Sequence, residues 1–125
     1  MSNWTDEELE RIGNAEELQL ASRREDGSLR RFTTMWVVRV ADQLFVRSAG
    51  GPHRPWYRHA LASKTGRVRT GDVETDVEFL RAEQGSDEEI DSQYHAKYDR
   101  YGPSIVDHVT GPVSVGLTVR LIKAA

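Results

Sequence analysis

The chain has 125 residues, 38% of them hydrophobic, and a formal net charge of -3. These values fit one compact domain spanning residues 1–125, and they exclude the overall positive field that draws a protein to nucleic acid or to an anionic membrane. The absence of cysteine excludes disulfides, thiol catalysis and cysteine-ligated metals. No apolar run approaches the roughly 20 residues of a membrane span, and no basic stretch followed by an apolar core indicates a signal peptide. We therefore expect a cytoplasmic protein that contacts neither membrane nor nucleic acid.

The first predicted element is an N-terminal helix. Thr5 stands at the N-cap position and Glu8 three residues later, which is the spacing of a capping box. Trp4 and Leu9 flank that box at the spacing of a hydrophobic staple. Gly13-Asn14 is expected to end the helix.

Three strands are predicted next. Residues 15–22 alternate between apolar and polar side chains, as in a half-buried strand. Asp26-Gly27 predicts a hairpin turn. Residues 30–40 are rich in β-branched and aromatic side chains and are apolar on both faces for most of their length, which predicts one long central strand covered on both sides. After a turn at Ala41-Asp42, residues 43–48 form the third strand of an antiparallel meander.

The second half of the chain contains further strands and two helices. A glycine-rich loop around Gly50-Gly51 leads into a helix over residues 56–63, which Thr65-Gly66 is expected to end. Strands are predicted over residues 67–70, 73–80 and 113–122 because apolar and polar residues alternate there.

A longer helix is predicted over residues 86–101, opened by a capping box at Ser86 and Glu89. Its apolar stripe at helical spacing consists of Ile90, Tyr94, Tyr98 and Tyr101. Such a stripe could stack on a ligand, but it is more typical of a buried core, and we favour the core. A short helical turn follows Pro103.

Many short strands joined by tight turns favour a mainly β (α+β) fold, a barrel or a sandwich, over a parallel sheet. The count is six antiparallel strands with two to four flanking helices. No G-x-G-x-x-G motif and no βαβ order supports a dinucleotide-binding fold.

The sequence argues against metal and hydrolytic chemistry. The histidines form no i, i+4 pair and no H-E-x-x-H motif, so we predict no metal site; they are His53, His59, His95 and His108. No serine lies in a G-x-S-x-G turn.

Arginines and the glycine-rich loop point instead to an anion site. If the strands form one barrel wall, several guanidinium groups can meet at one mouth; the candidates are Arg30, Arg31, Arg39, Arg47, Arg67 and Arg69. A guanidinium binds phosphate or carboxylate through two parallel hydrogen bonds, and glycine-rich turns bind anions through backbone N–H groups. Each arginine alone is more typical of a solvated surface residue.

The arrangement of these motifs resembles the split-barrel flavin and deazaflavin binders, which are the pyridoxamine-phosphate-oxidase-like and F420-dependent reductase families. The residues that carry the resemblance are Asp26-Gly27, Arg30-Arg31, Thr33-Thr34-Met35-Trp36, Leu44-Phe45-Val46-Arg47-Ser48, Gly50-Gly51 and Trp56-Tyr57. Over most of its length the chain is similar to the domain of unknown function 2255 family, with further matches at residues 94–98 and 113–121.

This resemblance implies a six-stranded split barrel that forms a homodimer and binds FMN or F420. Carried over residue by residue, it implies cofactor contacts at Arg31, Ser48, Gly50, Gly51, Trp56 and Tyr57, with Arg47 in the same phosphate-binding stretch. It places Thr33, Thr34 and Met35 along the cofactor ring.

The leading hypothesis is a flavin- or F420-binding oxidoreductase that transfers a hydride to a small organic substrate. Its general acid is not assigned, although Tyr57, His53 and His59 are near the loop. One alternative is a cofactor-free barrel that binds a small molecule or performs non-redox chemistry in the same pocket. Another is a structural or partner-binding dimer.

Overall fold

The structure is a computed structural model that describes residues 4–48, 53–71, 73–82, 87–102, 106, 110 and 117–124. Its strands form one sheet with the order β2-β1-β5-β6-β7-β4-β3. Every pairing in this sheet is antiparallel. The strands are β1 (Leu18–Ser22), β2 (Thr33–Met35), β3 (Val37–Val40), β4 (Gln43–Arg47), β5 (Thr65–Thr70), β6 (Val73–Arg81) and β7 (Thr118–Lys123).

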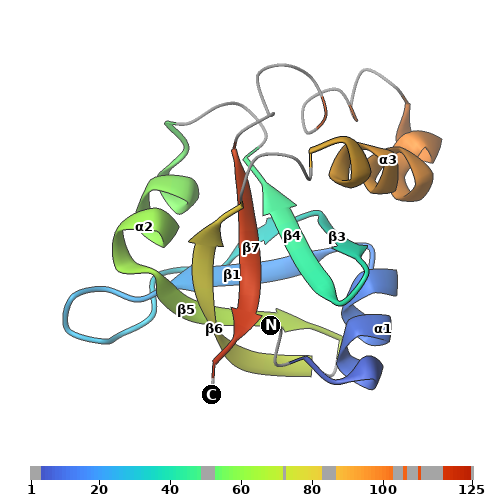
Figure 1. Ribbon diagram of the computed structural model, residues 1–125. Coiled ribbons are helices and arrows are strands. Elements are labelled where there is room, and N and C mark those ends of the chain that lie inside the picture. Colours follow the sequence, from blue (N-terminus) through green and yellow to red (C-terminus); the bar gives the residue numbers. More distant parts are fainter. Residues whose placement is uncertain are drawn as a thin grey trace.

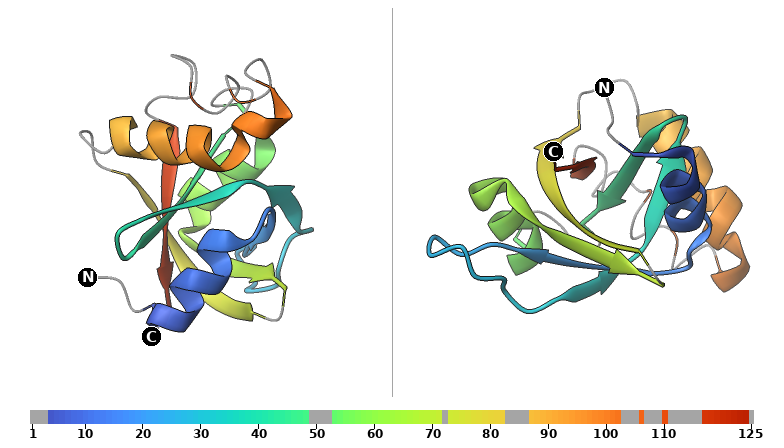
Figure 2. Two further views of the ribbon diagram at one scale, coloured as in Figure 1. Left: turned by 90° about the vertical axis from the view of Figure 1, so that its right-hand side faces the viewer. Right: turned by 90° about the horizontal axis from the view of Figure 1, so that it is seen from below.

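The helices are α1 (Asp6–Asn14), α2 (Pro55–Ser63) and α3 (Asp87–Tyr98), followed by a 3-10 helix over Asp99–Tyr101. Helices α2 and α3 lie on opposite sides of the sheet (Figures 1 and 2). Within the described residues, no helix is both long enough and apolar enough to cross a membrane.

The sheet curls into a nearly closed barrel because its two ends are consecutive in the chain. Strands β2 and β3 are separated only by Trp36, yet β2 pairs with β1 and β3 pairs with β4. The right-hand view of Figure 2 shows the strands wrapped around a common interior. The mainly β antiparallel barrel predicted from the sequence is therefore confirmed.

The prediction of six strands is wrong by one, and the cause is at Trp36. The predicted strand over residues 30–40 starts only at Thr33 and breaks at Trp36, where the chain leaves one neighbour and joins another. The Trp36 ring stacks on Tyr98 with 4.0 Å between ring centroids. The backbone carbonyl oxygen of Trp36 accepts a hydrogen bond of 3.4 Å from Tyr94 Oη. The backbone at Trp36 is thus bonded to α3 instead of continuing a ladder.

The barrel interior is apolar, as the strand alternation predicts. Its buried core includes Leu18 and Leu20 of β1, Leu44 and Val46 of β4, and the side chains Val37, Val68, Val77, Phe79, Val119 and Leu121. Residues 113–116 of the predicted last strand lie outside the described residues.

Strand β5 begins at Thr65, so the prediction that Thr65-Gly66 only ends the preceding helix is wrong. Gly66 sits inside the strand, where an added Cβ would lie 2.1 Å from the carbonyl oxygen of Ala21 and 2.7 Å from Phe79. The glycine is required because the neighbouring backbone approaches too closely for any side chain. The turn that ends α2 is made instead by Lys64, which has φ of 64°.

Helix α1 begins as predicted. Thr5 and Glu8 form both hydrogen bonds of the capping box. Trp4 is buried, and its Nε1 donates a hydrogen bond of 2.9 Å to the carbonyl oxygen of Leu121 on β7. Lys123 of β7 forms an ion pair with Glu8 at 2.9 Å. These contacts attach the first helix to the last strand.

Helix α3 covers the outer side of β3 and β4 and forms a second core (Figure 2, left). That core consists of Val38, Phe45, Ile90, Tyr94, Tyr98 and Val106. The tyrosine stripe is therefore mainly core, as favoured from its spacing, although Tyr101 remains 38% exposed. Ser86 of the predicted second capping box lies outside the described residues, as does most of the predicted turn after Pro103.

Candidate functional site

A hollow of about 280 Å³ lies between α2 and the segment that runs from β1 to β2. We call it the Trp56 cleft. Three groups of residues line it: Leu20 and Ser22 of β1, Arg24, Arg30 and Arg31 of the following segment together with Thr33 of β2, and Pro55, Trp56 and His59 of α2.

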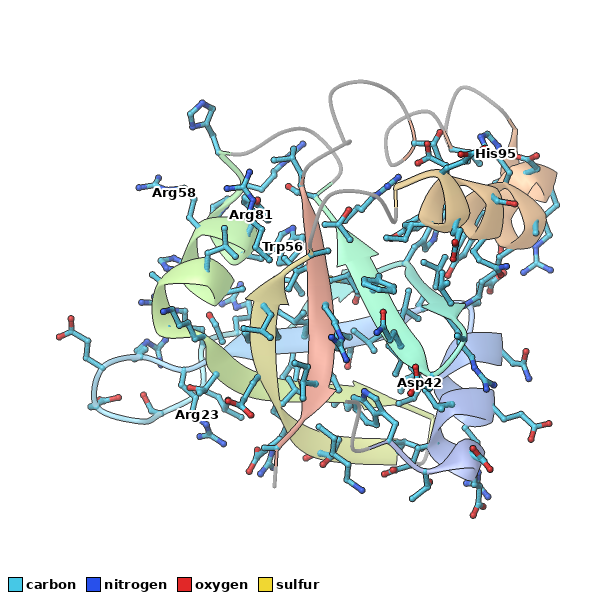
Figure 3. All side chains as sticks on the ribbon, in the orientation of Figure 1. Arg23, Asp42, Trp56, Arg58, Arg81 and His95 are labelled. Atoms are coloured by element: carbon cyan, nitrogen blue, oxygen red, sulfur yellow. The ribbon has the colours of Figure 1, made fainter. Side chains whose placement is uncertain are left out.

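The geometry of α2 presents Trp56 and His59 to this cleft. The two residues are three positions apart, so they lie on one face of the helix. Tyr57 and Ala60 occupy the face that packs into the barrel core. Pro55 stands at the start of the helix, where its missing N–H costs nothing. In Figure 3, Trp56 lies on the side of α2 toward the sheet, whereas Arg58 points away from it.

The cleft is cationic. Arg24, Arg30 and Arg31 line it, and none of the nine described residues around it carries a carboxylate. Arg24 Nη1 is held by hydrogen bonds to Ser28 Oγ at 3.3 Å and to the Leu29 carbonyl oxygen at 2.9 Å. In the described part of the chain, Arg30 Nε is buried without a hydrogen-bond partner. A buried donor that lacks a partner is costly to the folded state.

The cationic surroundings also act on His59. Loss of solvent around the ring lowers the pKa of His59 below its usual 6.5, and the charges of Arg30 and Arg58 lower it further. The imidazole is therefore mainly neutral at pH 7, with one nitrogen able to donate a hydrogen bond and the other able to accept one. The positive charge of the cleft is carried by its arginines.

Three of the predicted site residues meet in this cleft: Arg31, Thr33 and Trp56. Thr34 points to a separate hollow of about 330 Å³ on the other face of β2, beside Gln19 and Arg69. Met35 is half-buried against the barrel core, and Tyr57 is buried within that core. The three residues that the family resemblance places along the cofactor ring, Thr33, Thr34 and Met35, therefore lie in three different places.

Arg47 and Ser48 lie elsewhere. Both are buried. Arg47 Nε donates to Thr118 Oγ1 at 2.8 Å, and its Nη1 forms an ion pair with Asp91 of α3. The backbone N–H of Ser48 donates to the Leu117 carbonyl oxygen at 3.2 Å. Gly50 and Gly51, the other predicted contacts in this stretch, lie outside the described residues.

Of the six arginines named as candidates for one mouth, Arg30 and Arg31 line this cleft and the other four do not. Arg39 Nε donates to the Ala41 carbonyl oxygen at 2.7 Å. Arg67 is paired with Asp76 at 2.9 Å and with Glu74 at 3.1 Å. Arg69 lies over the Phe32 ring, with its Cζ 3.9 Å from the ring centroid. Side chains alternate across each strand, so arginines at different positions leave the barrel in different directions.

Sequence reasoning did not assign Arg24, Arg30 or His59 as cofactor contacts, although all three line the cleft. A signal for His59 is its helical spacing from Trp56. A signal for Leu20 and Ser22 is their two-residue spacing on β1, which directs both side chains to one face. Arg24 lies at the start of the hairpin, and nothing in its local pattern distinguishes it from a solvated arginine.

The model of one protein family matches residues 8–121, which is most of the chain. This chain belongs to that family, described as "Uncharacterized protein conserved in bacteria (DUF2255)". The membership predicted from the sequence is confirmed. A comparison with curated proteins found no match.

Several solved structures share the fold. An F420-H2 dependent reductase (FDR-A) is 17% identical, with 86% of this chain and 94% of that chain covered and a TM-score of 0.63. The heme storage protein HutZ from Vibrio cholerae is 15% identical, with 93% and 87% covered and a TM-score of 0.62. A FAD-binding protein from Mesorhizobium loti is 14% identical, with 98% and 91% covered and a TM-score of 0.58. At these identities the likeness shows a shared fold and no more.

Proposed function

We propose that this DUF2255 protein binds a flavin- or F420-type cofactor in the Trp56 cleft and reduces a small organic substrate by hydride transfer. The observation that carries the proposal is the charge of the cleft, which has three arginines and no carboxylate among its described lining residues. Such a site fits an anionic group. The cofactor phosphate is the anion that the related fold suggests.

Each part of the cleft has a role in this proposal. Arg24, Arg30 and Arg31 neutralise the phosphate charge. Trp56 and Leu20 supply an apolar wall beside it. The neutral His59 ring can hydrogen-bond to the ligand without adding charge. The bound cofactor supplies the hydride chemistry, and the protein supplies binding, orientation and exclusion of water.

The size of the cleft bears on how much of the cofactor it holds. Sites for drug-sized ligands measure roughly 300–1,000 Å³, and the Trp56 cleft of about 280 Å³ is slightly smaller. We propose that it holds the phosphate end and that the ring lies outside it, against a second copy of the chain. This placement agrees with the homodimer that the resemblance implies. Native mass spectrometry tests whether the protein is a dimer.

The same volume favours a second candidate function. A cationic hollow of this size also fits a small organic anion with no cofactor. The protein would then be a small-molecule-binding barrel. A purified protein that binds phosphorylated metabolites and ignores every flavin and deazaflavin would support this alternative.

The first experiment is an absorbance spectrum of protein purified from its own host and desalted, since foreign hosts can lack F420. The second is a thermal-shift titration with FMN, FAD and F420. We expect at least one cofactor to raise the melting temperature. Arg31→Ala should weaken its binding about tenfold, as for loss of one charge-assisted contact.

Arg11→Ala is the matched control, because Arg11 lies on α1 and is paired with Glu7 at 2.8 Å. It removes one positive charge far from the cleft in sequence and fold. A colourless protein that ignores all three cofactors would sink the redox proposal. If Arg31→Ala and Arg11→Ala reduced the cofactor affinity equally, the cofactor would not bind in the Trp56 cleft.

A further inference from the structure

A second hollow, of about 490 Å³, adjoins the Trp56 cleft. The two share Arg24, Arg30 and His59. The remainder of the second hollow is lined by Arg23, Glu25, Gly27, Ala62, Ser63 and Thr65. Three cationic or titratable side chains therefore stand on the border between two compartments.

The charges of the two compartments differ. The Trp56 cleft adds Arg31 to the border residues, and none of the described residues around it is acidic. The second hollow adds Glu25, and its own arginine, Arg23, is already bonded to Asp76 Oδ1 and to the Gly27 carbonyl oxygen, both at 2.8 Å. The cations available to a ligand are thus those of the border and the first compartment.

The remaining lining of the second hollow is small and uncharged. Ala62, Ser63 and Thr65 have short side chains, and Gly27 has none. Ser63 Oγ donates to the Thr65 carbonyl oxygen at 3.0 Å and keeps its lone pairs for a donor on a ligand. This surface suits a neutral group with hydroxyl or amine hydrogens. Glu25, in the same lining, disfavours a negative charge in the second hollow.

We infer that the protein selects a flavin cofactor that continues beyond its first phosphate, with the diphosphate on Arg24, Arg30 and Arg31 and a neutral polar nucleoside in the second hollow. The inference rests on the proposed function and narrows its cofactor class. A phosphomonoester such as FMN ends at the phosphate and leaves the second hollow unfilled. A flavin that continues through a diphosphate into a neutral nucleoside, as FAD does, fills both compartments.

The test compares FMN with FAD, which carry the same ring. Binding to the full chain is measured by quenching of flavin fluorescence or by calorimetry. We expect FAD to bind about tenfold more tightly than FMN or better, equivalent to about 1.4 kcal/mol. The ratio of FAD to FMN affinity is measured on the wild-type protein, so this first test does not depend on whether a variant folds.

Ala62→Trp then places bulk in the second hollow at an exposed helical position. It should bring the FAD affinity down to that of FMN and leave the FMN affinity unchanged. Ala62→Ser is the matched control, since it keeps a small side chain and should preserve the FAD preference. Thermal unfolding of both variants verifies that they fold.

The other outcomes separate the two proposals. FMN binding as tight as FAD binding, or a FAD preference that survives Ala62→Trp, would overturn the inference and leave the proposed function standing. Binding of F420 without binding of FAD would keep the proposed function and refute the neutral extension, because F420 carries carboxylates beyond its phosphate. Failure of all three cofactors to bind would refute both.

Discussion

The Arg47 guanidinium forms an ion pair with Asp91 of α3, and the arginine side chain is wholly buried. Arg47 and Phe45 project from the same face of β4, the face that α3 covers. The Arg47 side chain also lies over the Tyr94 ring, with its Cζ 5.8 Å from the ring centroid. This arginine therefore attaches α3 to the barrel, at a distance in sequence of 44 residues from its partner.

Removal of Asp91 should destabilise the protein strongly. Asp91→Ala removes a carboxylate that pairs with the buried Arg47 guanidinium, which should cost about 2 kcal/mol or more in the free energy of unfolding. The measurement is a urea denaturation curve. The double variant Arg47→Met/Asp91→Leu should recover most of that loss, because it replaces the ion pair with apolar contacts. A single-variant loss below about 1 kcal/mol would contradict this role.

The Tyr98 hydroxyl should contribute to stability where the Tyr101 hydroxyl does not. Tyr98 Oη lies 2.8 Å from the Glu16 carbonyl oxygen and 3.1 Å from that of Val37, and it accepts from the Val37 N–H at 3.3 Å. Tyr98→Phe keeps the ring stacked on Trp36 but leaves these buried backbone groups without the hydroxyl, at a cost of about 1–2 kcal/mol. Tyr101→Phe, on the exposed end of the same stripe, should change the free energy of unfolding by less than about 0.5 kcal/mol. Equal effects would disprove the assignment.

Lys97 should make stability depend on alkaline pH. Burial, and after it the charge of Arg100, lowers the pKa of Lys97 from 10.5 to about 8. Between pH 8 and 10.5 the unfolded chain binds the proton more tightly than the folded one, so the stability contributed by this group rises with pH in that window and is lowest below it.

Lys97→Met removes that dependence. From pH 7 to pH 9.5, the free energy of unfolding of the wild type should rise by about 1–2 kcal/mol relative to that of Lys97→Met. The variant also loses the 2.7 Å hydrogen bond from Lys97 Nζ to the Val37 carbonyl oxygen. That loss adds a constant to the difference in unfolding free energy and does not change how the difference depends on pH. A difference that is flat with pH would refute the buried-amine interpretation.

Gly66 should tolerate no side chain. Gly66→Ala places a methyl group against the Ala21 carbonyl oxygen and the Phe79 ring, which should cost about 3 kcal/mol or prevent folding. Phe79→Leu frees space on only one of these two sides. The double variant Gly66→Ala/Phe79→Leu should therefore remain as unstable as Gly66→Ala alone, measured by thermal unfolding. Rescue by Phe79→Leu would show that the backbone contact is unimportant.

The His59 pKa should report anion binding in the cleft. In the free protein, an NMR titration of the His59 ring should give a pKa below 6.5 because of burial and the charges of Arg30 and Arg58. Sulfate, which stays doubly charged across this range, should raise the pKa by offsetting the arginines. By linkage, sulfate should then bind more tightly as the pH falls through that pKa.

Arg58→Gln is a useful comparison, because it removes one of those charges without removing a residue that lines the cleft. It should raise the His59 pKa in the absence of sulfate and leave sulfate binding in place. A His59 pKa that does not respond to sulfate would place the anion elsewhere.

Local patterns predicted much of the fold. The Thr5 and Glu8 capping box, the inward Val77 and Phe79 of β6, and the buried tyrosines of α3 all follow from spacing along the chain. Periodicity shows which face of an element is apolar, and an apolar face is buried wherever the element packs. The sequence analysis counted six strands instead of seven because nothing local marks the break at Trp36. The chain breaks there because β2 pairs with β1 whereas β3 pairs with β4.

The candidate site was predicted less completely. Trp56, Arg31 and Thr33 were named from the family resemblance, and the structure brings them together. It separates them from Arg47, which the same resemblance implies. It joins to them Arg24, which the sequence did not single out, and Arg30 and His59, which were named from the sequence in other roles. Composition and spacing identify an arginine, but its direction depends on the curvature of the strand or segment that carries it.

The sequence by itself determined the family, the class of fold and the apolar face of nearly every element, because these depend on residues close together in the chain. Only the tertiary structure decided which cations share a space. The outer face of β4 is covered by α3, so Arg47 is buried against Asp91 there. The segment before β2 passes α2, so Arg30 and Arg31 meet Trp56 and His59. Closure of the barrel brings distant segments together, and electrostatic interactions act across space irrespective of separation along the chain.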